Sequence, residues 1–173
     1  MESFINTHFN FFPFIHDTYQ FCKKVEFFSC DNHPDYQNNP NRSTWPGLRS
    51  LEISQSEPFL FLTIIEHAQN KLGLKKELYK NILAYVHLRT EKDDLQDWIH
   101  KDTTDTILIY LSESNLNSGT TFYTNKEEII LDLRFLQNAS VFFDGSISHK
   151  SKLNYGNSLE NSRMTLNIFC YKK

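Results

Sequence analysis

The spacing of apolar residues changes along the chain, from a helical period before residue 78 to a strand-like period after it. The early pattern predicts a helix that begins near Pro13 and runs through Cys22. A second helix is predicted over Glu57–Leu72, because Pro58 suits a first helical turn and Gly73 suits a C-cap. The first part of the chain is therefore expected to supply helices.

Residues 31–50 contain three prolines and little periodicity, which predicts a long loop. Two interpretations stay open for this loop. It could close over a site and bring Trp45 and Arg49 to the substrate, or it could be an ordinary surface loop.

Short runs of alternating or continuous apolar residues follow from residue 78, separated by polar turns such as residues 117–120. Strands are predicted over Leu78–Arg89, Thr106–Leu111, Glu128–Phe135, Val141–Phe143 and Ser162–Lys173. Helices first and many strands afterwards predict a mainly β fold, an antiparallel barrel or jelly roll with flanking helices. We expect one domain over residues 1–173, with helical and loop support at 1–77 and the β core at 78–173.

Composition narrows the functional classes. The chain has 18 basic and 21 acidic residues, so it lacks the overall basic footprint of nucleic-acid-binding proteins, and we do not expect nucleic acid as a partner. Its apolar runs are too short for a membrane helix, and its N-terminus lacks the features of a secretory signal. Three cysteines without a CxxC pair favour a reducing cytosol, so we expect a cytoplasmic location.

A possible metal site is formed by His100, Asp102 and His149, in the order His-x-Asp and then a distal His. In a strand, His100 and Asp102 would point to one side of the sheet, and His149 could arrive from a later strand or turn. Two imidazoles and one carboxylate on one face of an ion leave the opposite positions open, as in the facial triad of non-haem Fe(II) oxygenases. The alternative is a surface pair and an unrelated loop histidine.

A second His-x-Asp, residues 33–35, is discarded because Pro34 cannot donate to a strand ladder and its surroundings resemble a loop.

Arg163 opens the last predicted strand and shares one face with Thr165, Asn167 and Phe169. An arginine inside a barrel is costly unless an anion pairs with it, and its planar fork matches a carboxylate. Thr165 and Tyr110 are candidate additional donors. The alternatives are a rim arginine in a surface ion pair and a core tyrosine whose hydroxyl is satisfied elsewhere.

The stretches WIHKD, FFDGSISHKSK and SRMTLNIF resemble the Fe(II)- and 2-oxoglutarate-dependent oxygenases, whose pattern is His-x-Asp, a distal His and then Arg-x-Ser/Thr. TILIYLSE followed by LNSGTTFYT resembles a hairpin of the prolyl-hydroxylase branch. The similarity covers roughly residues 78–171. It implies a double-stranded β-helix (jelly roll, cupin-like).

The resemblance also implies roles for single residues. His100, Asp102 and His149 would bind iron, and Arg163 would hold the distal carboxylate of 2-oxoglutarate with help from Tyr110 and Thr165. Tyr85 and His87 on the preceding strand are candidates for the other end of 2-oxoglutarate, and this choice stays open.

The implied activity is that of a dioxygenase that takes O₂ and 2-oxoglutarate, releases succinate and CO₂, and hydroxylates a C–H bond, with ascorbate as a candidate reductant. The prolyl-hydroxylase likeness favours a protein or peptide residue such as proline. Phe169 stands where demethylases of alkylated nucleic acid carry a second arginine, and Asp102 is retained where family halogenases lose the carboxylate. The chain ends soon after Arg163, so we expect a minimal catalytic core.

Two alternatives stay open: the same chemistry on a small metabolite or nucleic-acid base, and a non-catalytic jelly-roll binding protein.

Overall fold

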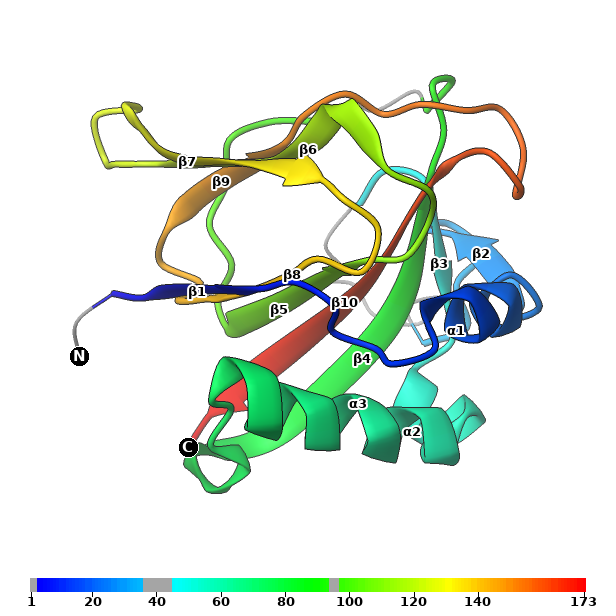
Figure 1. Cartoon of the computed structure of the whole chain (residues 1–173), viewed down its shortest axis with the longest axis horizontal. Coiled ribbons are helices and arrows are strands. Elements are labelled where there is room, and N and C mark those ends of the chain that lie inside the picture. Colours follow the sequence, from blue (N-terminus) through cyan, green and yellow to red (C-terminus); the bar gives the residue numbers. More distant parts are fainter. Residues whose placement is uncertain (1–2, 36–44, 94–96) are drawn as a thin grey trace.

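The computed structural model describes residues 3–35, 45–93 and 97–173, which form two antiparallel β-sheets with helices beside the larger one (Figure 1). The larger sheet has the strand order β1-β8-β5-β10-β4-β3-β2, and the smaller sheet has the order β7-β6-β9. The strands are β1 (Ile5–His8), β2 (Phe27–Ser29), β3 (Leu48–Ser50), β4 (Tyr79–Arg89), β5 (Asp105–Tyr110), β6 (Asn115–Tyr123), β7 (Ile129–Phe135), β8 (Ser140–Phe143), β9 (Ser148–Ser151) and β10 (Arg163–Lys172).

The helices are α1 (Ile15–Cys22), α2 (Ile53–Ser56) and α3 (Pro58–Leu72), followed by the short 3-10 helix η1 (Lys76–Leu78). In Figure 1, α2 and α3 lie along the outer face of the larger sheet, away from the smaller sheet. Gly73 ends α3 in the left-handed conformation with φ 73°, which a residue without a side chain adopts at little cost.

Alternation along the strands sorts the side chains into two layers. Met164, Leu166, Ile168 and Cys170 of β10 are buried in one cluster with the apolar side of α3. The second cluster, which includes Leu108, Phe122, Phe135 and Phe143, joins side chains of the larger sheet to those of the smaller sheet. The opposite face of β10 carries Arg163, Thr165, Asn167 and Phe169, and all four line a cavity. The predicted division of faces along this strand is confirmed.

Most predicted elements are confirmed with bounds that differ by one or two residues. They are the helices α1 and α3 and the strands β4, β5, β7, β8 and β10. These segments have a strong internal period or a long apolar run, so local sequence is enough to find them.

The description of residues 1–77 as helical and loop support is incomplete. Strand β1 pairs with β8, and β2 and β3 extend the larger sheet beyond β4. The predicted loop at 31–50 therefore ends in a strand, and its residues 36–44 lie outside the described ranges. Residues 117–120, predicted as a turn, belong to β6, where the pairing register with β7 shifts.

Candidate metal centre

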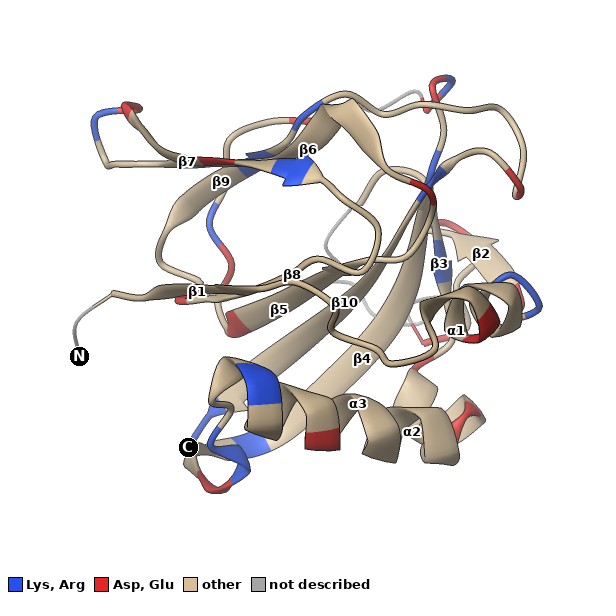
Figure 2. Ribbon diagram, viewed as in Figure 1, with Lys and Arg blue, Asp and Glu red and all other residues tan. Residues whose placement is uncertain are grey.

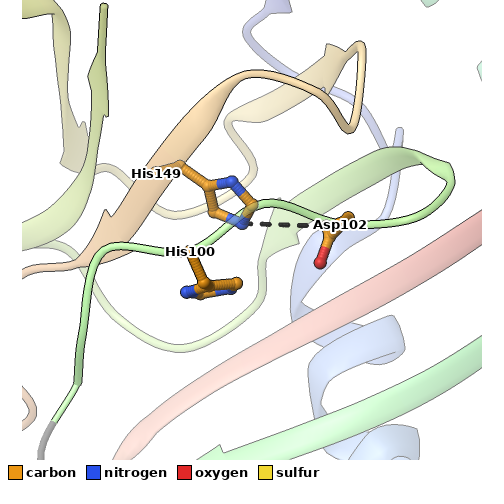
Figure 3. A group of neighbouring side chains, drawn as sticks. All are labelled: His100, Asp102 and His149. Atoms are coloured by element: carbon orange, nitrogen blue, oxygen red, sulfur yellow. Dashed lines mark ion pairs between the residues drawn. The ribbon is translucent and has the colours of Figure 1, made fainter. Parts of the chain in front are cut away.

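His100, Asp102 and His149 lie side by side (Figure 3). One ligand-type atom from each residue lies within 4.8 Å of the others. His149 belongs to β9, and His100 pairs with it in an isolated antiparallel bridge. The backbone nitrogen of His100 donates to the carbonyl oxygen of His149 at 3.0 Å, and the backbone nitrogen of His149 donates to the carbonyl oxygen of His100 at 2.8 Å. The backbone bridge thus brings the two imidazoles together.

Asp102 was predicted to lie in a strand with His100, and this prediction is wrong. Asp102 lies in the segment just before β5. Its backbone N–H donates to the carbonyl of Gly145 at 2.8 Å. The carboxylate Oδ2 accepts a hydrogen bond from Thr106 Oγ1 at 2.6 Å and lies 3.7 Å from His149 Nε2. Tertiary contacts, not a shared strand, place Asp102 beside the histidines.

Both histidines are oriented by backbone carbonyls. The Nδ1 atom of His100 lies 2.9 Å from the carbonyl oxygen of Trp98, and that of His149 lies 3.0 Å from the carbonyl oxygen of Ile147. Because a carbonyl can only accept, each Nδ1 carries the proton in these hydrogen bonds. The lone pair of each Nε2 is then available to a metal ion.

His149 is buried, and its ring packs against those of Phe122 and Phe143. Burial lowers the pKa of His149, and the nearby His100 lowers this pKa further, while Asp102 opposes both effects. The outcome favours the neutral imidazole, which is the form that binds a metal.

The donor set fits a first-row divalent ion. Ligands about 2.1 Å from one ion and on the same face of it lie about 3.0 Å apart, so the three donors, which lie within 4.8 Å of one another, have to move closer by up to about 1.8 Å around a bound ion. Two nitrogens and one carboxylate oxygen are the donors that Fe(II) oxygenase sites use.

The other His-x-Asp pair, His33 and Asp35, has no third possible metal ligand beside it within the described residues. His33 is fully buried, and its Nε2 lies 2.9 Å from the carbonyl oxygen of Ser50.

The three residues line a cavity of about 450 Å³, which is within the usual size range of small-molecule sites. Arg163 lines the same cavity and is only 4% exposed. Its guanidinium carbon lies 5.5 Å from the ring centre of Phe135 and 6.0 Å from that of Tyr110. No acidic side chain in the described ranges forms an ion pair with Arg163, and its buried Nε has no hydrogen-bond partner there.

Burial lowers the pKa of Arg163, although an arginine remains a cation at neutral pH. A buried cation of this kind needs an anion to offset its desolvation. The structure therefore places Arg163 inside the cavity and not in a surface ion pair.

Tyr110 and Thr165 face each other across β5 and β10, but both hydroxyl groups already have protein partners. Tyr110 donates to Thr120 Oγ1 at 2.9 Å, and burial raises the pKa of Tyr110 to about 12. Thr165 donates to Asn167 Oδ1 at 2.7 Å. Thr165 and Thr120 line the cavity, whereas Tyr110 lies behind them in the core. Their roles toward a ligand stay predictions.

Thr106, which donates a hydrogen bond to Asp102, was not among the residues predicted from the sequence. The signal was present, because strand alternation places Thr106 on the same face as Leu108, and both line the cavity. Arg89 also lines the cavity, but it forms ion pairs with Asp93 and, at 2.7 Å, with Asp97. These partners lie in a segment without a clear period, so no pattern indicated them.

No family model matches the chain, and no curated protein matches it. Solved structures do resemble it. A prolyl-4-hydroxylase from Pseudomonas putida is 13% identical, with 98% of this chain and 92% of that chain covered and a TM-score of 0.58. The fold is a jelly roll of the kind found in 2-oxoglutarate oxygenases. The predicted fold class is confirmed.

Two further structures share this fold. A prolyl hydroxylase from Trichoplax adhaerens, in complex with a peptide fragment of a hypoxia inducible factor, is 13% identical with a TM-score of 0.57 over 97% of this chain and 83% of that chain. The non-heme alpha-ketoglutarate-dependent epimerase SnoN from nogalamycin biosynthesis is 10% identical with a TM-score of 0.57 over 96% and 78%. Identities this low carry the fold and leave the chemistry to the residues of the site.

Two features that the sequence predicts are the lack of a membrane-spanning helix and the lack of an overall basic footprint. No helix within the described ranges has the length and apolar character needed to cross a bilayer. Acidic and basic positions are interspersed over the ribbon in the view of Figure 2, in keeping with the formal net charge of −3.

Proposed function

We propose that this protein is an Fe(II)- and 2-oxoglutarate-dependent dioxygenase that hydroxylates a C–H bond. One observation carries the proposal. Three metal-ligand side chains converge in a cavity that also holds a buried arginine without an acidic partner among the described residues. A metal site beside a lone buried cation is suited to a cosubstrate that chelates the metal at one end and carries a carboxylate at the other.

In this proposal, Nε2 of His100, Nε2 of His149 and the carboxylate of Asp102 hold the iron. Bound iron would supply O₂ activation coupled to the conversion of 2-oxoglutarate to succinate and CO₂. The carbonyls of Trp98 and Ile147 fix the two imidazole tautomers.

The other residues of the site bind and orient. Thr106 holds one oxygen of the Asp102 carboxylate. Arg163 binds the distal carboxylate of 2-oxoglutarate, with Thr165 and Tyr110 as neighbours that could turn their hydroxyl groups toward it. Phe122 and Phe143 keep water away from His149.

The proposed substrate is a protein or peptide residue such as proline. Support comes from the prolyl hydroxylases among the similar structures, one of which holds a peptide. The similar structure of an epimerase supports a second candidate, the same cofactor chemistry on a small metabolite, because one fold serves different substrates.

The proposal is tested with Asp102→Ala, and Asp35→Ala is the matched control from the other His-x-Asp. Mn(II) binding without oxygen and succinate formation with Fe(II), 2-oxoglutarate and O₂ are measured for both variants. We expect the control to bind one equivalent of metal and to form succinate like the unmodified chain. In Asp102→Ala, Mn(II) affinity and the rate of succinate formation should each fall by more than about tenfold. Near-normal succinate formation by Asp102→Ala would overturn the proposal, and a protein that binds no stoichiometric metal would favour a non-catalytic jelly roll.

A further inference from the structure

The cavity contains a second buried cation, Arg49 of β3, which is 8% exposed. Its guanidinium carbon lies 4.0 Å from the ring centre of Trp45, 5.1 Å from that of Tyr85 and 5.8 Å from that of Phe169. All three aromatic residues also line the cavity. Arg49 is thus held in an aromatic frame at the cavity wall.

Such a frame favours a particular kind of ligand. A guanidinium that stacks on an aromatic ring uses its faces, and its N–H donors lie in its plane. This geometry suits a carboxylate, which accepts two parallel hydrogen bonds from one guanidinium. The aromatic walls also exclude water, which strengthens the attraction between the charges.

Strand register locates Arg49 relative to the cosubstrate site. Arg49 pairs with His87, His87 pairs with Thr165, and Thr165 pairs with Tyr110, so the four residues form one row across β3, β4, β10 and β5. Neighbouring strands lie about 4.8 Å apart, which puts Arg49 about 10 Å from Thr165 along this row. Arg49 is therefore at a different strand position from Arg163.

The aromatic frame also extends toward the metal centre. Phe169, which contributes one wall of the frame, pairs with Thr106, and Thr106 holds the carboxylate of Asp102. A group bound at Arg49 would therefore sit on the β3 side of the metal centre. In the proposed function, the metal and Arg163 take the two ends of 2-oxoglutarate, so the cosubstrate does not require Arg49.

His87 supplies an independent indication of a ligand. Its side chain lines the cavity beside Arg49, and its buried Nε2 has no hydrogen-bond partner within the described ranges. Burial lowers the pKa of His87 well below its usual range, and the charge of Arg49 adds to this effect. The imidazole is therefore neutral and can offer an N–H donor next to the guanidinium.

We propose that Arg49, His87 and Trp45 form a carboxylate subsite that anchors the primary substrate next to the metal centre. The ligand chemistry is one carboxylate, from a free amino acid or from the C-terminus of a peptide. This inference rests on the proposed oxygenase function, because it assigns the second anion site of the same cavity to the molecule that is hydroxylated.

Tryptophan fluorescence tests the inference. The chain has two tryptophans, and both line the cavity, so Trp98→Phe leaves Trp45 as the single reporter. In this background, the protein is loaded with Mn(II) and saturating 2-oxoglutarate without oxygen. It is then titrated with non-aromatic free amino acids, each paired with its amide, and with dipeptides that have a free or amidated C-terminus.

We expect a saturable change of Trp45 emission with acids and none with the matching amides. Arg49→Gln should weaken the response at least about tenfold, the loss expected for a hydrogen bond to a charged group. Arg49→Lys should retain part of it, since it keeps the charge and loses the planar fork. Arg134→Gln removes an exposed arginine outside the cavity and should change nothing. A response to free amino acids alone identifies a small acid, and a response to dipeptides alone identifies a peptide C-terminus.

Equal responses to acids and amides, no response to any acid, or an unchanged response in Arg49→Gln would overturn the inference. Calorimetric 2-oxoglutarate affinity in the same samples separates this failure from that of the proposed function. If Arg49→Gln loses 2-oxoglutarate binding, Arg49 is a cosubstrate anchor and only the subsite is wrong. If the unmodified chain binds no metal or 2-oxoglutarate, the oxygenase proposal itself fails.

Discussion

At the residue scale, Arg163 gives the sharpest prediction for the cosubstrate. It is buried, and no acidic side chain in the described ranges pairs with it. Removing one partner of a buried, hydrogen-bonded charge pair costs about 2–5 kcal/mol of binding free energy. Arg163→Ala should therefore weaken 2-oxoglutarate binding to the Mn(II) protein by this amount, measured by calorimetry, while metal affinity stays the same. An unchanged 2-oxoglutarate affinity would place Arg163 outside the binding site.

A second prediction at this scale concerns Thr106, which donates to Oδ2 of Asp102. Partners of metal ligands typically contribute 10–100-fold to metal affinity. Thr106→Val keeps the shape and removes the donor, so we expect Mn(II) affinity to fall by about tenfold or more. Thr106→Ser keeps the hydroxyl and should bind metal nearly as well as the unmodified chain. If both variants bind Mn(II) equally well, Thr106 does not position Asp102.

At the scale of elements, the sequence predicts the segments whose pattern is local. The 3.6-residue period identifies α3, and alternation identifies β10 and places Arg163 on the cavity side. It does not identify β1 or β3, which have four and three residues and exist because β8 and β4 offer them a pairing edge. Strands this short depend on the strands that pair with them, and a local pattern cannot reveal them.

In the candidate site, too, some residues can be found from a local pattern and others only from contacts between distant parts of the chain. The spacing His-x-Asp pointed to residues that the structure brings together with His149, but the assumed reason, a shared strand, was wrong for Asp102. Asp102 is held by Gly145 and Thr106, and only Thr106 is on a predicted face. Arg49 joins the cavity through the pairing of β3 with β4, a contact between distant parts of the sequence.

The contact between the segment before β5 and the turn after β8 gives a third prediction. A Cβ atom at Gly145 would lie 1.9 Å from the carbonyl oxygen of Thr104 and 3.0 Å from that of Asp102. Gly145→Ala should therefore displace this segment, lowering the free energy of unfolding by about 1–3 kcal/mol and weakening Mn(II) binding. Denaturant unfolding and metal titration measure the two effects.

Gly73→Ala is the control for Gly145→Ala. The space around Gly73 is open, so a Cβ atom there meets no other atom. Gly73→Ala should still lower the free energy of unfolding by about 1–2 kcal/mol, because alanine is strained in the left-handed conformation. The two variants can therefore be equally unstable, but only Gly145→Ala should lose metal affinity. Unchanged Mn(II) binding in a folded Gly145→Ala protein would show that this turn does not support Asp102.

At the scale of the whole molecule, the cavity leaves histidines in surroundings that disfavour their charged form. Burial lowers the pKa of both His87 and His149. In the unfolded chain, a histidine has a pKa of about 6.5. Below this pH, the unfolded chain takes up protons that the folded chain excludes, so unfolding becomes more favourable as pH falls. The contribution to stability is fully present above about pH 6.5 and is lost as pH falls toward the folded pKa values.

The metal-free protein should therefore lose stability between pH 7 and pH 5.5, by up to about 1.4 kcal/mol per pH unit below 6.5 for each of the two histidines. Denaturant unfolding at each pH measures this slope. His87→Gln removes one titrating group from the cavity wall and should reduce the slope, whereas His16→Gln, which removes an exposed histidine of α1, should leave it unchanged. An equal slope in all three proteins would show that His87 takes up a proton in the folded cavity as readily as in the unfolded chain. In that case the cavity would be less positive than its three arginines suggest. The expected preference of the cavity for carboxylates would then be weaker.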